Sequence, residues 1–387
     1  MESVRSEPPD LPIFALAPVA GAHHAWVGML LESERGCTAE HLRRLFEDCG
    51  LSGALGALPC IVDCAGVAPE AVAGLAPESA MALCRDGGGE ATKALRERGF
   101  GVFWQAAPDR PIPAGIDALA WEAAQPLPAA TAAVMRRLPG PHLALAVDDS
   151  DRFERSLAGG FAWLAGDYPL HFASLNFSRG HGPVYAVLMR LLGLVVHDAE
   201  TRAIEAVLKQ DTQLSFHLLR LVNSAAFARP TPITSFNQAI TVLGRRQLQR
   251  WLQLLLYANP KGSGPSALLP RAAYRAHFME SLCRRAGGNA EAQDHAFMTG
   301  IFSLLDAVFG LPLAELVAPL NLPAPVAAAL LQRAGAFGNL LDLVIRAQPA
   351  ADAAPVRERL RSAGIDSDGY ARAMVEACHW ATRLDQG

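Results

Sequence analysis

The chain has 387 residues, 51% of them hydrophobic, and a formal net charge of −4. This length is enough for two or three domains with cores of their own. The near balance of charge argues against a protein that mainly wraps nucleic acid. No apolar run reaches the roughly 18–20 residues of a membrane span, and the beginning, MESVRSEPPD, has no apolar signal core. We therefore expect a cytoplasmic protein without membrane contact.

The first half of the chain alternates short apolar runs with helical patterns. One such helix follows Thr38 and ends at Gly50, and another runs from Ser150 to Gly159. Strand–helix alternation with short connections predicts parallel strands in an α/β barrel or an open sheet. The predicted strands are Trp26–Leu31, Pro59–Cys64, Ala80–Arg85, Phe100–Gln105, Ile116–Trp121, His142–Asp148 and Gly160–Leu164.

From Pro183 onward, strand patterns give way to successive amphipathic helices. Helices are expected near Arg271–Arg285, Ala296–Phe309 and Asp368–Thr382, for example. The segment from Tyr168 to Gly182 contains glycine and proline and is the predicted linker. The sequence therefore predicts an α/β domain over residues 11–172 and an all-α domain over residues 183–381.

Seven cysteines are scattered along the chain without a Cys-x-x-Cys motif. Cys60 and Cys64 are the closest pair, but four residues of a strand separate them by ~13 Å, too far for one disulfide or one metal. We expect the cysteines to be small buried hydrophobic residues in a reducing compartment.

The stretch LKQDTQLSFHLLRLVNSAAFARPTPITSFNQAITVLGRRQLQRWLQLLL resembles the HDOD family. These are helical output domains of bacterial signalling proteins, related in fold to HD phosphohydrolases. Later segments resemble the YuxH-like variant, in which an EAL-type domain precedes HDOD. The positions that match the family pattern are Asp211, Leu214, Asn223, Ser224, Ser235, Gly244, Trp251 and Asp306.

We interpret these HDOD positions as structural. Asn223 stands where a helix ends, a place that suits asparagine, and Gly244 fits a helix stop. The resemblance would place the metal-binding His-Asp pair of HD enzymes at Leu305-Asp306, where leucine replaces histidine. Another His-Asp, at His197-Asp198, fits a helix N-cap instead. No metal is expected here, and Asp306 is expected to cap or hydrogen-bond within the bundle.

The first half resembles EAL phosphodiesterases, which cleave cyclic di-GMP inside a βα barrel; LPIFALAPVAGAHHAWVGMLLES is similar to their opening strand pair. The resemblance implies two divalent cations held by carboxylates and an asparagine, with a lysine nearby. Here the signature glutamate falls near Gly28, the asparagine position is Asp63, and Gln105-Ala106-Ala107 replaces an acid pair. Asp63 and Asp148 remain as residual acids.

The predicted lysine strand, IDALAWEAA, contains no lysine. The first half is also shorter than the ~250 residues of a full barrel. Both observations predict a truncated, catalytically silent EAL-like barrel.

The sequence thus predicts a signal-transduction adaptor that is not an enzyme, holds no cofactor or metal, and acts through contacts with other signalling proteins. Homodimer formation stays open, and cyclic di-GMP binding is expected to be weak or absent. One alternative is a cyclic-dinucleotide phosphodiesterase or HD-type phosphohydrolase. A second is a DNA-binding regulator that uses Arg245, Arg246 and Arg250, although these arginines also fit the solvated face of core helices.

Overall fold

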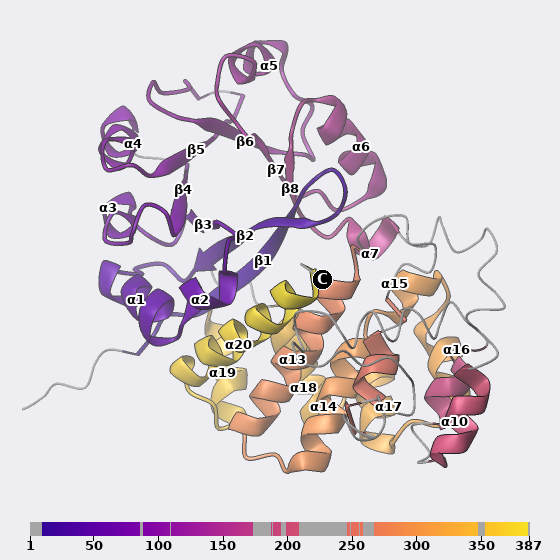
Figure 1. The fold of residues 1–387 in the computed structure, drawn as a ribbon. Helices are drawn as coiled ribbons and strands as arrows, with labels where there is room; N and C mark the ends of the chain where they lie inside the picture. Colours follow the sequence, from indigo (N-terminus) through magenta and orange to yellow (C-terminus); the bar gives the residue numbers. More distant parts are fainter. Residues whose placement is uncertain are drawn as a thin grey trace, which may run out of the picture.

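The protein consists of a β-barrel followed by a helical half (Figure 1). The computed structural model describes residues 10–85, 88–108, 110–172, 187, 189–194, 199–208, 246–247, 249–254, 256–257, 267–346 and 353–385. The barrel lies within the first three described stretches, and most of the helical half lies in the last two.

Eight strands close the barrel in sequence order. β1 (Phe14–Ala20) pairs antiparallel with both β2 (Trp26–Ser33) and β8, whereas all pairings from β2 to β8 are parallel. The seven predicted strands overlap β2 to β8, and the opening strand was expected only from the family resemblance. The other strands are β3 (Cys60–Asp63), β4 (Ala80–Cys84), β5 (Gly101–Gln105), β6 (Ala118–Glu122), β7 (Leu143–Leu145) and β8 (Trp163–Ala165).

The prediction of a truncated barrel is wrong, because the sheet is complete. The first half of the chain is short because its outer layer of helices is incomplete, and not because strands are missing. A turn alone joins β1 to β2, and no helix lies between β5 and β6 among the described residues there. The helices of this half are α1 (Ala39–Arg43), η1 (Arg44–Asp48), α2 (Leu51–Leu55), α3 (Pro69–Val72), α4 (Gly88–Glu97), α5 (Ala129–Met135), α6 (Ser150–Ala158) and α7 (Pro169–Phe172).

The helical half is built around α13 (Leu269–Arg285), which packs against α14 (Ala290–Phe302) and α20 (Ser367–Asp385). The backbones of α13 and α14 come close at Gly300, where a Cβ atom would lie 2.6 Å from the Cα of Ala276. The other helices are α10 (Thr201–Leu208), α15 (Leu305–Phe309), α16 (Leu313–Val317), η3 (Ala318–Leu320), α17 (Ala324–Gln332), α18 (Gly335–Arg346) and α19 (Ala354–Ser362).

Within the described part of the chain, no single helix has both the length and the apolar composition of a membrane span. Two strongly bent helix pairs meet those two criteria only when their members are taken together: Ala290–Phe309 with Leu313–Leu320, and Ala324–Gln332 with Gly335–Ile345.

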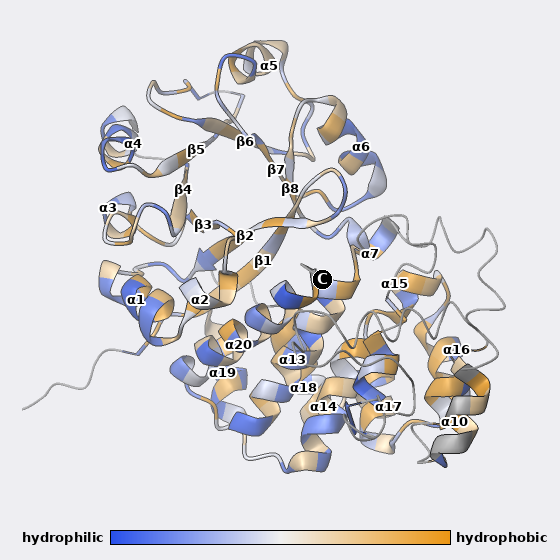
Figure 2. Cartoon of the chain, viewed as in Figure 1, coloured by the Kyte–Doolittle hydropathy of each residue, from blue (hydrophilic) through white to orange (hydrophobic). Residues whose placement is uncertain are grey.

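The two halves share one hydrophobic core. Figures 1 and 2 show α20 and α13 beside the β1–β2 hairpin, which has no barrel helix of its own, and the strands there are largely apolar. Buried residues of β1 and α20, such as Phe14 and Met374, belong to one continuous cluster. At the same junction the buried hydroxyl of Thr382 donates to the carbonyl of Ala54, at 3.0 Å. The domain limits 11–172 and 183–381 stay predictions, and most of the predicted linker lies outside the described residues.

Candidate functional site

Apolar side chains fill the inside of the barrel. Alternate residues of each strand face inward, and those of the central layer pack together as a separate buried cluster. The barrel is therefore closed through its middle, as small parallel barrels are. The buried members of this cluster are Val19, Leu30, Ile61, Leu83, Phe103, Ala118, Ala120, Leu143, Leu145 and Ala165.

Polar side chains follow this layer at the carboxyl ends of five consecutive strands. Each stands two residues after an apolar inward residue and therefore faces the same interior. We call the five residues the mouth ring: Glu32, Asp63, Arg85, Gln105 and Glu122. In parallel βα barrels, active sites are built at this end.

An ion pair between Asp63 and Arg85 forms the buried part of the mouth ring. The Nε of Arg85 lies 3.0 Å from Oδ1 of Asp63, and its Nη2 contacts Oδ2. The Asp63 side chain is only 1% exposed, and its Oδ1 also accepts the backbone N–H of Ala65 at 2.9 Å. Both carboxylate oxygens of Asp63 are thus engaged, whereas the Arg85 side chain is one-third exposed.

Two of the other members of the mouth ring, Glu32 and Gln105, keep capacity for a ligand. Burial, together with the charge of Asp63, raises the pKa of Glu32 above its usual value, and Arg85 offsets only part of that effect. The amide nitrogen of Gln105 donates to Glu122 at 2.9 Å. The amide oxygen of Gln105 is buried and has no hydrogen-bond partner among the described residues, so it can accept a donor from a bound molecule.

The mouth ring does not fit the two-cation centre that the family resemblance implies. The carboxylate of Asp63 already accepts hydrogen bonds from Arg85 and from a backbone amide, and the carboxylate of Glu122 accepts one from Gln105. Within the described ranges, no three histidine, cysteine or acidic side chains are grouped so that they could share one ion. We therefore derive no step through a metal.

The second residual acid of the sequence analysis, Asp148, lies apart from this ion pair. It follows β7, pairs with Arg152 at 2.9 Å and accepts the backbone N–H of Asp167 at 3.3 Å. Its side chain is about half exposed. The contacts of Asp148 therefore belong to the turns that follow β7 and β8.

Two of the HDOD positions lie in the described part of the helical half. Trp251 is a core residue that is 1% exposed. Asp306 is exposed at the beginning of α15, where its carboxylate accepts the N–H of Ala307 at 2.9 Å. The structural role of these positions stays a prediction. The positions that fall outside the described residues are Asp211, Leu214, Asn223, Ser224, Ser235 and Gly244, as does His197-Asp198.

Ion pairs occupy the arginines of the DNA-binding alternative that are described. Arg246 and Arg250 both bind Asp294, at 2.5 and 3.0 Å, and Arg250 also contacts Glu280. Arg250 is only 15% exposed and stacks on Phe297 at 4.7 Å. Arg245 lies outside the described part. A paired, half-buried arginine cluster does not form the open basic face that phosphate binding needs, so the structure argues against this alternative.

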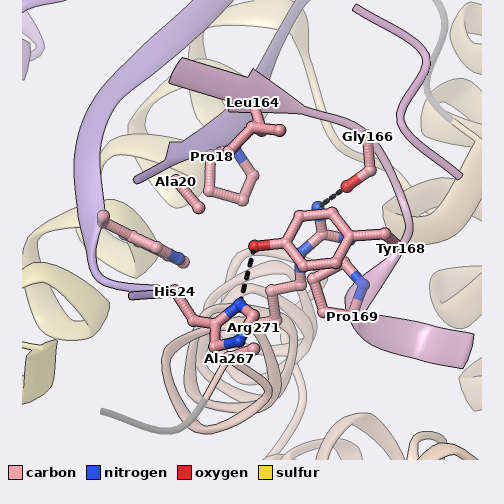
Figure 3. A pocket seen from close by; sticks show the side chains of 10 residues that line it. Pro18, Ala20, His24, Leu164, Gly166, Tyr168, Pro169, Ala267 and Arg271 are labelled. Carbon is pink, nitrogen blue, oxygen red and sulfur yellow. Dashed lines mark hydrogen bonds between the residues drawn. The ribbon is translucent and has the colours of Figure 1, made fainter. Parts of the chain in front are cut away.

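A small cavity lies at the junction between the halves, outside the barrel wall (Figure 3). The empty space between its lining atoms amounts to about 210 Å³, part of which is open to solvent. Arg271 of α13 closes one side and donates to the Asp167 carboxylate at 2.6 Å and to the carbonyl of Gly166. On another side the imidazole of His24 meets the hydroxyl of Tyr168 at 3.3 Å. The two contacts of Arg271 join α13 to the segment that follows β8.

Comparison with known proteins identifies the class of the helical half. Residues 183–314 match the model of the HDOD domain. The chain therefore contains an HDOD domain, as the sequence predicted, and its first half is a closed eight-stranded barrel.

Two curated relatives extend the similarity. Cyclic di-GMP phosphodiesterase CdgJ of Vibrio cholerae is 28% identical over 245 residues, which cover 63% of this chain and 56% of that protein. The uncharacterized protein YuxH of Bacillus subtilis is 25% identical over 209 residues, or 52% of this chain and 50% of that protein. The chain thus spans about half the length of these relatives.

Among solved structures, the EAL-like domain protein YdiV resembles this chain with a TM-score of 0.32 and 12% identity. The match covers 41% of this chain and 92% of that one.

One prediction from the sequence needs correction. The chain was expected not to be an enzyme, because the acids of the EAL pattern were missing at their expected positions. The similarity to a protein named as a cyclic di-GMP phosphodiesterase contradicts that expectation. The mouth ring holds two acids that the sequence reasoning did not consider: Glu32 lies near Asp63, and Glu122 lies near Arg85 and Gln105, and neither matches an expected motif position.

Proposed function

We propose that the barrel is an EAL-type domain and that its mouth ring binds and hydrolyses a cyclic dinucleotide of the cyclic di-GMP type. The observation that carries this proposal is the convergence of five charged or amide side chains at the catalytic end of the barrel. The similarity to the Vibrio phosphodiesterase supports it.

Arg85 is the group that would recognise the phosphodiester. Its guanidinium already makes two contacts with the carboxylate of Asp63, the geometry with which arginine also binds phosphate. Because one-third of the Arg85 side chain is exposed, a phosphate can reach it from the open end of the barrel. The Gln105 amide oxygen could accept an N–H of the base or a ribose hydroxyl.

Glu32 is the group suited to proton transfer. Hydrolysis of a phosphodiester needs a proton for the leaving oxygen and removal of one from the attacking water. A carboxyl whose pKa is raised above the usual value serves this task better than an ordinary glutamate. Glu32 lies near Asp63 and Arg85, whose charges act on it, so it would lie close to a phosphate held by Arg85.

The test uses the full chain with cyclic di-GMP. Calorimetry measures binding and chromatography measures the linear product, each with and without added Mg²⁺ or Mn²⁺. We expect binding and turnover in the wild type, loss of both in Arg85→Ala, and loss of turnover with retained binding in Glu32→Gln. Arg96→Ala is the matched control, because Arg96 pairs with Asp117 outside the mouth ring.

Each outcome bears on a separate part of the proposal. A wild type that neither binds nor cleaves cyclic di-GMP would refute it. Binding without product would support the site and reject hydrolysis. Equal losses in Arg85→Ala and Arg96→Ala would show that the effect of Arg85 is not specific to the mouth ring. The role of other signalling proteins as partners stays a prediction beside this one.

A further inference from the structure

Two cysteines lie side by side directly behind the mouth ring. Cys64 follows Asp63 at the end of β3, and Cys84 precedes Arg85 at the end of β4. The register of the two strands pairs Asp63 with Leu83, and the N–H of Cys64 continues the ladder by donating to the carbonyl of Leu83 at 2.9 Å. Cys64 and Cys84 are therefore the next pair in register.

Both thiols lie on the same, outer face of the barrel wall. Asp63 and Leu83 face the interior, so their successors face outward. Cys84 is fully buried and packs in the core shared with the helical half, and Cys64 packs partly buried against that core. Neighbouring strands lie about 4.7–4.9 Å apart, within the Cα separations of 4.4–6.8 Å that disulfides span.

The two thiols also interact chemically. The neighbouring thiol of Cys84, together with burial, raises the pKa of Cys64, and the thiol of Cys64 lowers the pKa of Cys84, while the Sγ of Cys64 itself donates to the carbonyl of Val62 at 3.9 Å. The thiolate of Cys84 is thus stabilised by the thiol of its partner. No other pair among the seven cysteines combines adjacent register with a shared face of the barrel wall.

We propose that Cys64 and Cys84 form a reversible disulfide that stiffens the mouth ring. The oxidant is a low-molecular-weight disulfide such as oxidised glutathione. The partly exposed thiol of Cys64 transfers its proton to the Cys84 thiolate as its sulfur attacks the small disulfide, so that a mixed disulfide forms and one small thiolate leaves. The departing thiolate removes the proton from Cys84, whose sulfur then displaces the second small thiolate, so that two protein thiols are oxidised and one small disulfide is reduced to two thiols.

The disulfide would act on the Asp63–Arg85 ion pair, because each cysteine is covalently next to one member of it. Cross-linking the ends of β3 and β4 fixes the two backbones that carry these side chains. If a phosphate must draw Arg85 away from Asp63, the oxidised form would bind cyclic di-GMP more weakly, by about fivefold or more. This regulatory effect rests on the proposed function, whereas formation of the disulfide does not.

The first experiment detects the bond without any nucleotide. The full chain is treated with oxidised glutathione, the remaining thiols are blocked, and the tryptic peptide Leu45–Arg85, which contains both cysteines, is weighed. Hydrogen exchange then follows the Ala65 amide, which donates to Asp63. We expect the loss of two thiols from this peptide and slower exchange, both reversed by dithiothreitol. Cys64→Ser should abolish both changes, whereas Cys49→Ser, which alters a cysteine of the same peptide, should not.

The results separate the two parts. If both thiols survive oxidation, or if Cys49→Ser blocks the change as fully as Cys64→Ser, the disulfide is refuted. If it forms and the exchange of Ala65 is unchanged, the stiffening is refuted. Cyclic di-GMP affinity, measured in the oxidised and reduced wild type, tests regulation: equal affinities reject it, and absence of binding in both forms rejects the proposed function while the disulfide stands. Cys84→Ala provides a second variant.

Discussion

Arg357 of α19 and Glu34, the residue just after β2, form an ion pair that joins the helical half to the barrel. The Nε of Arg357 lies 3.4 Å from one carboxylate oxygen of Glu34, and its Nη2 contacts the other. The second oxygen also accepts the backbone N–H of Ile13 at 3.2 Å. Because Glu34 stands two residues after Glu32, this contact holds the chain beside the mouth ring.

The Arg357–Glu34 pair should contribute little to stability. Both side chains are 29% exposed, so water screens the attraction, and we expect a coupling free energy below about 1 kcal/mol that shrinks in high salt. Urea unfolding of Arg357→Ala, Glu34→Ala and the double variant measures it. The pair Arg361–Glu358 on the same helix, more than 70% exposed on both sides, is the control and should show still less coupling. A larger coupling at Arg361–Glu358 would contradict this reasoning.

The cluster around Glu280 should make the protein sensitive to acid. Burial alone would raise the pKa of Glu280, but hydrogen bonds and charges from His277 and Arg250 outweigh it and hold the pKa below its usual value. A carboxyl with a lowered pKa in the folded state stabilises the protein above its unfolded pKa of 4.5. This stabilisation is lost as the pH falls through the lower folded value.

Glu280→Gln tests this effect. The variant should unfold at a lower temperature than the wild type near neutral pH, by an amount worth about 1–3 kcal/mol, since Asp294 is then the one charged partner that Arg250 keeps among the described residues. The difference in unfolding temperature between Glu280→Gln and the wild type should become smaller at acidic pH. Melting curves between about pH 3 and pH 7 measure it, and a constant difference across that range would show that charge is not the cause.

Glu32 should show the opposite dependence on pH. Its raised pKa means that the folded barrel disfavours the ionised carboxylate. Stability is therefore lost as the pH rises from the unfolded pKa of 4.5 to the folded value, and Glu32→Gln removes that loss. We expect Glu32→Gln to have a higher melting temperature than the wild type at neutral pH and the same melting temperature at acidic pH. A variant that is less stable at neutral pH would show that the charge of Glu32 is well compensated.

Gly300 should tolerate no side chain. A Cβ atom there would lie 2.6 Å from the Cα of Ala276 and 2.9 Å from the carbonyl of Arg275, both backbone atoms of the neighbouring helix. Gly300→Ala must push α13 and α14 apart, at a cost of about 1–3 kcal/mol or more. Gly53→Ala, in α2, is the matched control, because nothing lies within 4 Å of its Cβ position.

The control variant should gain up to about 1 kcal/mol from the better helix propensity of alanine. Chemical denaturation of both variants measures the two effects. Equal changes in Gly300→Ala and Gly53→Ala would mean that helix propensity, and not the close approach of two helices, governs both positions.

Local sequence patterns predicted the strands well, because an apolar run of five or six residues bounded by turns usually forms a buried strand in an α/β chain. Leu143–Leu145 and Cys60–Asp63 lie within predicted runs for this reason. Closure of the barrel was not predictable in the same way. Chain length suggested a truncated barrel, whereas the structure omits outer helices and keeps all eight strands.

The mouth ring was only partly predictable. Asp63 was singled out as a residual acid, but Glu32, Arg85 and Glu122 were not, because they converge only through the register of separate strand pairs. Alternation within each strand could have found them: each is an isolated polar residue two positions after an apolar inward one. The pairing of Cys64 with Cys84 depends on the same register, which spacing along the sequence does not reveal.

The packing of α20 against the β1–β2 hairpin has a consequence during translation of the chain. The hairpin leaves the ribosome about 330 residues before α20, which at about 5–20 residues per second means a delay of tens of seconds. Throughout this delay the apolar outer face of the first two strands lacks its native partner. The nascent chain therefore presents a binding surface for a molecular chaperone long before translation of α20 can bury it.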